Sequence, residues 1–314
     1  MANKQNSEKK GIIAIIIPVY NAEDYITGCL ESIISQTYPY WRAYCVNDGS
    51  KDGSLDILKK YASLDKRITI LSKENGGAAK ARNYALDKLK DEEWVSFVDA
   101  DDYIAPSMYA TILNTITKDC DYIRLFNHRT TLRYSQQVWG DNSTDKATAK
   151  LVNRDDYFNH EAVGGFISSI FVKKSIIDSF HVRFHENMRI FEDQLFSITC
   201  ASYSKNILII QEPKDYYYYD NCKSVTRQTK NLSDDIVRCI NGVYDVICSS
   251  DDILDNFFYK KYLPAKLEEY YSNKLKNKIV NQTELLNSQI NISRSKLSIK
   301  TIVLRTAILF LGLK

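Results

Sequence analysis

The chain has 314 residues, of which 44% are hydrophobic and 26% are charged. These proportions are those of an ordinary globular protein with a full core, arranged as one large domain or two small ones. The formal net charge of +3 is too small to indicate a nucleic-acid partner.

The seven cysteines are odd in number and include no Cys-x-x-Cys pair. Several stand in apolar stretches, which is typical of buried reduced thiols in a cytosolic protein rather than of a disulfide framework or a zinc site. The seven are Cys29, Cys45, Cys120, Cys200, Cys222, Cys239 and Cys248.

An apolar run at 12–17 follows Lys9 and Lys10 near the start of the chain. The run is short for the apolar part of a signal peptide, and no small-residue cleavage site follows it. We therefore interpret it as the first buried strand. No window of about eighteen uncharged apolar residues occurs in the chain, so no transmembrane helix is predicted.

Strand-like and helix-like patterns alternate over the first hundred residues. After the strand at 12–17, Asn21 is the expected N-cap of a helix that ends near residue 37. Further strands are predicted at 42–46, 68–71 and 94–98, with a helix between each pair. This alternation predicts an α/β protein with a parallel, doubly wound sheet.

The pattern is less regular after residue 100. A helix is predicted from Pro106 to about residue 117, a polar hairpin-like stretch at 128–150, and a further helix after Glu192. Additional strands are expected at 122–126, 164–172, 207–210 and 216–219. From about residue 232 the periodicity is helical to the end.

Three carboxylates, those of Asp99, Asp101 and Asp102, follow the apolar strand at 94–98. In open α/β sheets the ligand crevice lies at the carboxyl ends of the strands, where these acids fall. A hard divalent cation that bridges carboxylates to substrate phosphates accounts for such a cluster. The alternative is a solvated acidic turn.

Asp48 stands in Asn47-Asp48-Gly49-Ser50 at the end of the second predicted strand. It is either a turn residue or, beside the same crevice, an acceptor for the N–H of a nucleotide base. Gly76-Gly77 allows a close backbone approach to phosphate at a helix N-terminus, and Arg82 in that helix could reach a diphosphate.

The set of motifs, in this order and spacing, resembles that of family 2 glycosyltransferases, which have the GT-A fold: a Rossmann-like, mostly parallel central sheet flanked by helices. The resemblance covers about residues 11–227, and we predict a catalytic domain at 1–230 with a helical extension at 231–314. The motifs are Pro18-Val-Tyr20-Asn21, Asn47-Asp48-Gly49-Ser50, Asn75-Gly76-Gly77, Ala81-Arg82-Asn83, Asp99-Ala100-Asp101-Asp102 and Glu192-Asp193.

The resemblance implies an inverting transfer from a nucleotide sugar, usually a UDP-sugar, assisted by Mn²⁺ or Mg²⁺. Asp101, with Asp99, is implied to hold the metal, Asp193 to be the catalytic base, and Glu192 to help position the acceptor. The implied nucleotide-binding residues are Pro18, Tyr20, Asn21, Asp48, Asn75, Gly76, Gly77, Arg82, Asp99 and Ala100.

These roles agree with the chemistry of the reaction. A divalent ion neutralises the leaving diphosphate without a general acid, so one carboxylate is enough to take the proton of the acceptor hydroxyl. Taken alone, Glu192-Asp193 is more typical of the acidic first turn of a helix, whose dipole favours negative charge, than of a catalytic pair.

Two departures from the family pattern limit what carries over. No Gln-x-x-Arg-Trp motif follows Asp193, which favours transfer of a single sugar over polymer synthesis. Some members of the family have a histidine near the metal late in the domain, but the segment 216–227 of this chain has none. Arg227 is a weak candidate for contact with the diphosphate, and Asp102 is a weak candidate for contact with the acceptor or the diphosphate. His181 and His185 lack a third metal ligand and are interpreted as acceptor-side or surface residues.

The lysine-rich helical extension could bind an acidic lipid surface, pack on the catalytic domain or form a homodimer. Its last apolar stretch, 299–313, is too short to span a bilayer, and an in-plane anchor is favoured slightly over a docking helix. We expect a cytoplasmic enzyme at the inner membrane face, acting on a glycan or lipid-linked saccharide in cell-surface polysaccharide synthesis. The alternatives are a nucleotidyltransferase or a catalytically silent sugar-nucleotide or glycan-binding module.

Overall fold

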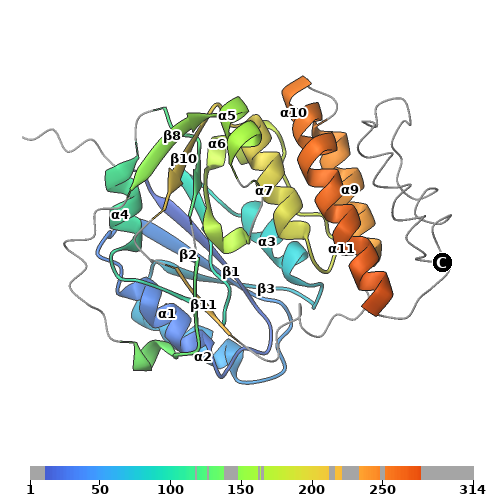
Figure 1. Ribbon diagram of the computed structural model, residues 1–314. Coiled ribbons are helices and arrows are strands. Elements are labelled where there is room, and N and C mark those ends of the chain that lie inside the picture. The colour runs from blue at the N-terminus through green and yellow to red at the C-terminus, as the bar shows by residue number, and fades with distance from the viewer. Residues whose placement is uncertain are drawn as a thin grey trace, which may run out of the picture.

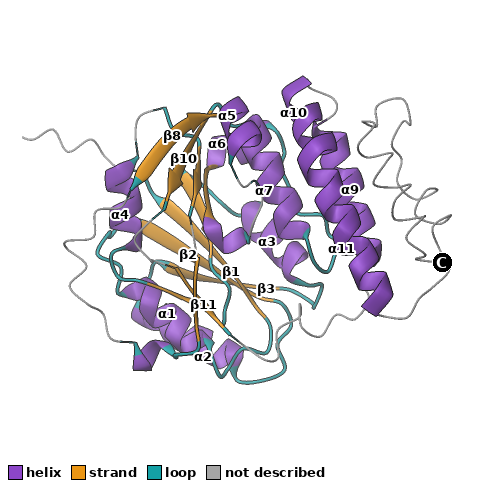
Figure 2. Cartoon of the chain, viewed as in Figure 1, coloured by secondary structure: helices purple, strands orange, loops and turns teal. Residues whose placement is uncertain are grey.

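The computed structural model describes residues 11–116, 119–125, 127–137, 148–161, 163, 166–211, 216–220, 233–247 and 252–276. Within them, eight strands form one mixed sheet in the order β3-β2-β1-β4-β9-β6-β10-β8. Three short strands form a second sheet, β5-β11-β7. Helices cover both faces of the large sheet (Figures 1 and 2).

The first four strands are parallel, and they confirm the predicted alternation. They are β1 (Ile13–Val19), β2 (Trp41–Asn47), β3 (Ile68–Ser72) and β4 (Trp94–Phe97). β1 pairs with both β2 and β4, so the loops that follow these three strands meet at one edge.

The second half of the large sheet is mixed, which the strand–helix alternation did not predict. β6 (Tyr122–Arg124) and β10 (Asn206–Ile210) are parallel to each other. β9 (Ile170–Lys173) is antiparallel to both β4 and β6, and β8 (Ala149–Asn153) is antiparallel to β10. The amino end of β9 therefore lies at the edge where β4 and β6 have their carboxyl ends.

β1 is apolar at successive positions because both of its faces are buried. Ile13, Ile15 and Ile17 pack on one face of the sheet, and Ala14 and Ile16 pack on the other, all with no exposed surface. This is the expected alternation of side chains on a strand that has helices on both sides.

Different helices cover the two faces of the large sheet. The face of Ile15 is covered by α1 (Ile26–Ile34), α2 (Ser54–Leu64) and α4 (Met108–Thr115). The face of Ile16 is covered by α3 (Ala78–Leu86), α5 (Arg154–His160), α6 (Lys174–Ser179) and α7 (Glu192–Tyr203).

α1 begins at Ile26, so the prediction of Asn21 as its N-cap is wrong. Asn21 has a left-handed backbone, with φ 48°, and its side-chain oxygen accepts the N–H of Lys51 at 2.8 Å. The residue thus links two loops instead of capping a helix, because a tertiary hydrogen bond has replaced the local one.

The two described ends of the stretch predicted to be hairpin-like, 128–150, do not pair with each other, and residues 138–147 lie outside the described residues. β7 (Asn127–Thr130) belongs to the small sheet, where it pairs with β11 (Tyr216–Tyr219), whereas β8 lies at the edge of the large sheet. β5 (Tyr103–Ile104) completes the small sheet on the other side of β11.

The C-terminal helices form an outer layer against α7 and α5, at the right of Figure 1. They are α9 (Ser233–Ile247), α10 (Asp252–Phe257), a π-helical turn (Phe258–Tyr262) and α11 (Leu263–Lys276). Ile236, Ile240 and Leu267 belong to the same apolar cluster as Phe196 of α7. Of the three roles predicted for the extension, packing on the rest of the chain is therefore observed for these helices.

The remaining predictions for the extension are not tested. The boundary at residue 230 stays a prediction, and the apolar stretch 299–313 lies outside the described residues. No helix among the described residues is long and apolar enough to cross a membrane.

Five cysteines confirm the prediction of buried free thiols: Cys29, Cys45, Cys120, Cys200 and Cys239. Cys222 and Cys248 lie outside the described residues.

Candidate active site at the carboxyl ends of the strands

Asp48, at the end of β2, is buried and surrounded by hydrogen-bond donors. Its carboxylate accepts the N–H groups of Gly76 and Gly77, the latter at 2.7 Å, and the side-chain amide of Asn75. Lys73 forms an ion pair with it at 2.7 Å. The two glycine N–H groups that were predicted to bind phosphate therefore donate to Asp48 in this structure.

Gly77 has a backbone that only glycine adopts readily. Its φ of 90° lies in the left-handed region, at the residue immediately before α3. This conformation lets the N–H groups of Gly76 and Gly77 converge on one carboxylate. The glycine pair thus fixes the position of Asp48.

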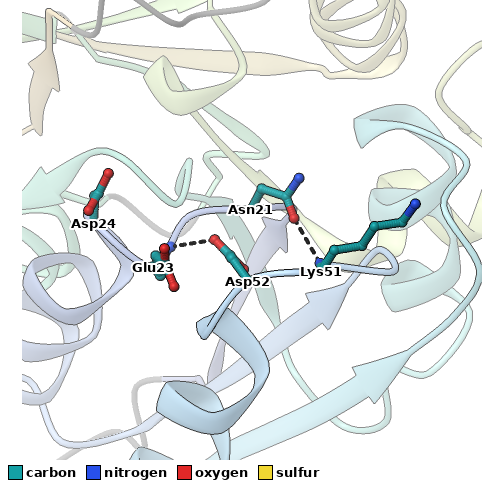
Figure 3. A pocket seen from close by; sticks show the side chains of 5 residues that line it. All are labelled: Asn21, Glu23, Asp24, Lys51 and Asp52. Carbon is teal, nitrogen blue, oxygen red and sulfur yellow. Dashed lines mark hydrogen bonds between the residues drawn. The ribbon is translucent and has the colours of Figure 1, made fainter.

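The loops after β1 and β2 are joined beside Asp48. The N–H of Asn21 donates to the hydroxyl of Ser50 at 3.1 Å, and the N–H of Glu23 donates to Asp52 at 3.1 Å. Between these loops lies a polar cavity of about 310 Å³, whose lining side chains are drawn in Figure 3. The lining residues are Asn21, Glu23, Asp24, Lys51 and Asp52.

Two other residues of the predicted nucleotide pocket lie at the end of β1. Pro18 is in the strand, and Tyr20, just past it, has 49% of its surface exposed. The Pro-Val-Tyr-Asn motif, predicted to follow the first strand, therefore begins inside β1 and continues into the loop at the carboxyl edge of the sheet.

The carboxylates after β4 have different environments. Asp99 has a third of its side chain exposed, and Asp101 is partly exposed. Asp102 is buried: it accepts the hydroxyl of Tyr216 at 2.6 Å and the N–H of Tyr219 at 2.9 Å. Burial, and then the charges of Asp99 and Asp101, raise the pKa of Asp102 well above its ordinary value.

These acids suit a divalent cation that is completed by its substrate. No three His, Cys, Asp or Glu side chains among the described residues are grouped as a metal site. Mg²⁺-type sites commonly use one or two carboxylates together with phosphate oxygens, so Asp99 and Asp101 are a sufficient protein contribution. The negative field that raises the pKa of Asp102 also favours a cation here.

Arg82 of α3 joins two predicted motifs that are far apart in the sequence. Its guanidinium is buried and forms ion pairs with Asp99 at 2.8 Å and with Glu192 at 3.1 Å. Burial alone would lower the pKa of Arg82, but the charges of Asp99 and Glu192 outweigh it and raise the pKa. The side chain that was predicted to reach a diphosphate thus bridges two carboxylates.

Glu192 and Asp193 form the first turn of α7, as predicted. Burial, followed by the charge of Asp193, raises the pKa of Glu192 to about 7 although Arg82 opposes the shift. Burial also raises the pKa of Asp193, against Arg82 and the N–H groups of Gln194 and Ile167. The pair therefore holds a proton at a higher pH than ordinary carboxyl groups do.

The residue before this pair is strained. Phe191 has φ 68°, a left-handed conformation that is rare for a bulky side chain. Lys266 of α11 lies 3.8 Å above its ring, and the Cys239 thiol of α9 contacts its carbonyl oxygen at 3.7 Å. The C-terminal helices therefore hold Phe191 in a conformation that a bulky residue seldom adopts alone.

Sequence reasoning missed three residues of this region: Lys73, Tyr216 and Lys266. Lys73 sits two residues before a recognised motif, and Tyr216 belongs to a run of four tyrosines that indicated only a strand. Lys266 is one of many lysines in the extension. Of the three, only Lys73 could have been identified as a site residue from the sequence, because it precedes Asn75 in the loop after β3.

The remaining candidates have different outcomes. His181 and His185 are exposed, as the surface interpretation predicted. Arg227 lies outside the described residues, and Ala100 is buried between Asp99 and Asp101.

Known proteins resemble this chain in sequence. The model of the family described as glycosyl transferase family 2 matches residues 14–171, half of the chain. The chain is 29% identical to the teichoic acid poly(glycerol phosphate) polymerase of Staphylococcus epidermidis, over 89% of this chain and 37% of that protein. It is 31% identical to the poly(ribitol-phosphate) beta-glucosyltransferase of Bacillus spizizenii, over 66% of this chain and 32% of that protein.

The chain is also 27% identical to the putative glycosyltransferase EpsH of Bacillus subtilis, over 70% of this chain and 64% of that protein. It thus spans less than two thirds of the length of each of these three relatives.

Solved structures share the fold. S. aureus TarS 1-349 in complex with UDP-GlcNAc matches with a TM-score of 0.68 at 20% identity, over 89% of this chain and 78% of that one. The mannosyltransferase PcManGT from Pyrobaculum calidifontis, in complex with GDP-Man and Mn²⁺, matches with a TM-score of 0.58 at 14% identity, over 96% and 87% of the two chains. With the family match and this shared architecture, the chain belongs to glycosyl transferase family 2 and has the GT-A fold.

Proposed function

We propose that this chain transfers a single sugar, with inversion, from a UDP-sugar to a hydroxyl of a glycan or lipid-linked saccharide in cell-surface polysaccharide synthesis. The observation that carries the proposal is the bridge made by Arg82. It connects Asp99, in the motif expected at the donor diphosphate, to Glu192, next to the expected base Asp193. A donor and an acceptor hydroxyl can therefore meet between two motifs that the chain holds together.

The donor half of the proposal concerns the loops after β1, β2 and β4. Asp48 is held rigidly by four donors and would accept the base N–H, while Tyr20 and Asn21 would line the nucleotide. Asp99 and Asp101 would hold Mn²⁺ or Mg²⁺. When bound, such an ion neutralises the charge that develops on the leaving diphosphate.

The acceptor half concerns the first turn of α7. The raised pKa of the Glu192–Asp193 pair gives it the proton affinity that a general base needs near neutral pH. Asp193 would take the proton of the acceptor hydroxyl as its oxygen attacks the anomeric carbon. Arg82 would orient the carboxylate of Glu192, which would then position the acceptor.

Names of relatives support the polysaccharide context. Two relatives are named for teichoic acid or poly(ribitol-phosphate) synthesis, and a structural neighbour was solved with UDP-GlcNAc. We extend this to a cytoplasmic enzyme at the inner membrane face, with residues 1–230 as the catalytic domain and 231–314 as a helical region.

The test is donor turnover by the purified chain. UDP release would be measured for UDP-glucose, UDP-galactose and UDP-GlcNAc, with Mn²⁺ or with a chelator, and with oligosaccharide acceptors. We expect release with one sugar, lost in Asp101→Asn and Asp193→Asn, and a product of inverted anomeric configuration by NMR.

The matched control is Asp56→Asn, which changes an aspartate of α2 whose side chain is 85% exposed. It should behave as the wild type does. Binding of a UDP-sugar without any turnover would instead identify a sugar-nucleotide-binding module and contradict the proposed activity.

A further inference from the structure

Two aromatic rings are stacked at the surface beside the candidate site. Phe166, which precedes the turn Ile167–Ser169, has 60% of its surface exposed, and its ring lies against that of Tyr218 in β11. The ring centroids are 5.9 Å apart and the planes differ by 21°. Tyr218 is half-buried, so the pair presents one exposed ring supported by another, and aromatic side chains of this kind are common in ligand-binding grooves.

The position of Tyr218 relates the pair to the donor motif. Side chains alternate along a strand, so Tyr218 lies on the same face of β11 as Tyr216, about 7 Å further along. The hydroxyl of Tyr216 accepts the N–H of Asp99 at 3.2 Å and donates to Asp102 at 2.6 Å. Tyr218 is therefore next to the loop that carries the predicted metal ligands.

The position of Phe166 relates the pair to the predicted base. The backbone of its neighbour Ile167 lies close enough to the carboxylate of Asp193 to oppose the rise in the pKa of that group. β9 brings this turn to the site because it runs antiparallel to β4, with its amino end at the carboxyl edge. The pair Phe166–Tyr218 thus lies beside both motifs between which transfer would occur.

We propose that Phe166 and Tyr218 form the platform on which the ring of an acceptor pyranose is stacked, an inference that rests on the function proposed above. The C–H face of a pyranose is apolar and flat, so its burial on aromatic rings is favourable, while the hydroxyl groups at the ring edge stay available for the base. A linear polyol phosphate has no such face. The platform therefore selects a saccharide acceptor over a glycerol or ribitol phosphate chain.

The chain contains a matched control pair. Phe180 and Tyr203 are also exposed, at 47% and 38%, and their rings stack at 4.0 Å. Tyr203 is the last residue of α7, about 16 Å along the helix from Glu192. The control variants thus remove another surface aromatic stack, at the end of α7 far from Glu192.

The experiment is saturation-transfer NMR on the full chain with UDP and diamagnetic Mg²⁺ present. The probes are methyl β-glucopyranoside, methyl β-galactopyranoside and methyl β-N-acetylglucosaminide, compared with glycerol 3-phosphate and ribitol 5-phosphate. We expect saturation transfer to the ring protons of a pyranoside. Phe166→Ala or Tyr218→Ala should lower the affinity for that pyranoside about tenfold, as truncation of an aromatic anchor does. Phe180→Ala and Tyr203→Ala should retain it.

Three outcomes would overturn the platform: pyranoside binding that Phe166→Ala and Tyr218→Ala leave unchanged, binding of polyol phosphates alone, or binding of neither class. UDP-sugar turnover by the wild type, measured in parallel, separates this failure from that of the proposed function. If the wild type turns over a UDP-sugar and any of the three outcomes is observed, the platform proposal is rejected and the proposed transferase activity stands. Thermal unfolding of each variant shows whether a loss of binding reflects a loss of fold.

Discussion

The two sides of the candidate site are built from different ranges of the chain. On the strand side, which we define by Asp48 and the loop 73–77, all contacts of the carboxylate join residues 25 to 29 positions apart. On the helix side, which we define by Glu192 and Asp193, Arg82 comes from 110 positions earlier. The C-terminal helices support the same turn through Lys266 and Cys239.

The two sides also differ in their electrostatics. Asp48 accepts backbone N–H groups and a side-chain amide and pairs with a lysine, so its position is fixed by four neighbours. The helix-side carboxyl groups have raised pKa values because burial exceeds the compensation from Arg82. A rigidly held acceptor is suited to recognition, and a group that exchanges its proton near neutral pH is suited to catalysis.

The most severe test of this contrast is Asp193→Asn. We expect a loss of about 10²–10⁴-fold in kcat, the range for removal of a general base, with little change in the Kd for UDP. Steady-state kinetics and calorimetric titration with UDP measure the two quantities. If UDP affinity fell as much as kcat, the helix side would also be part of the donor site and the contrast would fail.

Arg82→Met breaks the connection between the sides. The variant leaves Glu192 buried without its cation, which should lower the free energy of unfolding by about 3 kcal/mol. Asp99 also loses its partner, but its side chain is a third exposed, so it should add little to this loss of stability. Urea denaturation measures this loss. The double variant Arg82→Met/Glu192→Gln should recover most of it, and failure to recover would show that packing rather than charge holds Arg82.

The pH profile distinguishes the sides without a mutation. Because the pKa of Glu192 is raised to about 7, the pair is protonated on the acid side, and kcat/KM should fall about tenfold per pH unit below that value. The Kd for the nucleotide, which binds at the strand side, should not show a corresponding change below this pH. A flat profile of kcat/KM from pH 5 to 8 would contradict the role of the pair.

The same shift has a consequence for stability with a defined sign. The folded protein binds more protons than the unfolded chain between the ordinary carboxyl pKa of 4.5 and about 7. The contribution of Glu192 to the free energy of unfolding is therefore fully present below pH 4.5 and decreases as pH rises to 7. Glu192→Gln should remove this decrease, as measured by urea denaturation across the range.

Lys266→Met tests whether the outer helices matter to the site. The lysine is buried over the ring of Phe191, and its removal should lower stability by about 1–2 kcal/mol. We expect kcat to fall several-fold while the KM for the donor stays constant, because only the first turn of α7 is disturbed. Lys88→Met, which removes a lysine over the ring of Tyr84, is the matched control and should leave both constants unchanged.

Lys73→Met should have the smallest effect. Asp48 keeps the N–H donors of Gly76, Gly77 and Asn75, so the lost ion pair should weaken UDP binding by about 1 kcal/mol or less. Calorimetry at two salt concentrations checks this. A loss much larger than that would mean that Lys73 contacts the nucleotide itself.

Much of the strand side could be predicted from the sequence because its residues follow strands. Once the alternation of 12–98 indicated a parallel sheet, the ends of β1, β2 and β4 had to meet at one edge. The position of Asp48 and Asp99 at that edge followed from topology alone. The direction of β9 did not, because an isolated apolar strand carries no indication of its neighbours.

The helix side was predictable only as a motif. Glu192-Asp193 was placed correctly at a helix start, but the left-handed backbone of Phe191 and its contact with Lys266 depend on tertiary packing between distant segments. The sequence indicated that Arg82 could reach a diphosphate, but it gave no indication that Arg82 pairs with Glu192. Its partner became known only when α3 and α7 were placed on the same face of the sheet.

The long separation between Arg82 and Glu192 has a consequence for the newly made chain. At about 5–20 residues per second, the ribosome adds the 110 residues between them in about 5 to 20 seconds. Asp99, only 17 positions after Arg82, is made first and can neutralise it while the second carboxylate is still missing. The parallel half of the sheet can therefore form during translation with its buried cation already paired, and arrival of α7 then completes the site.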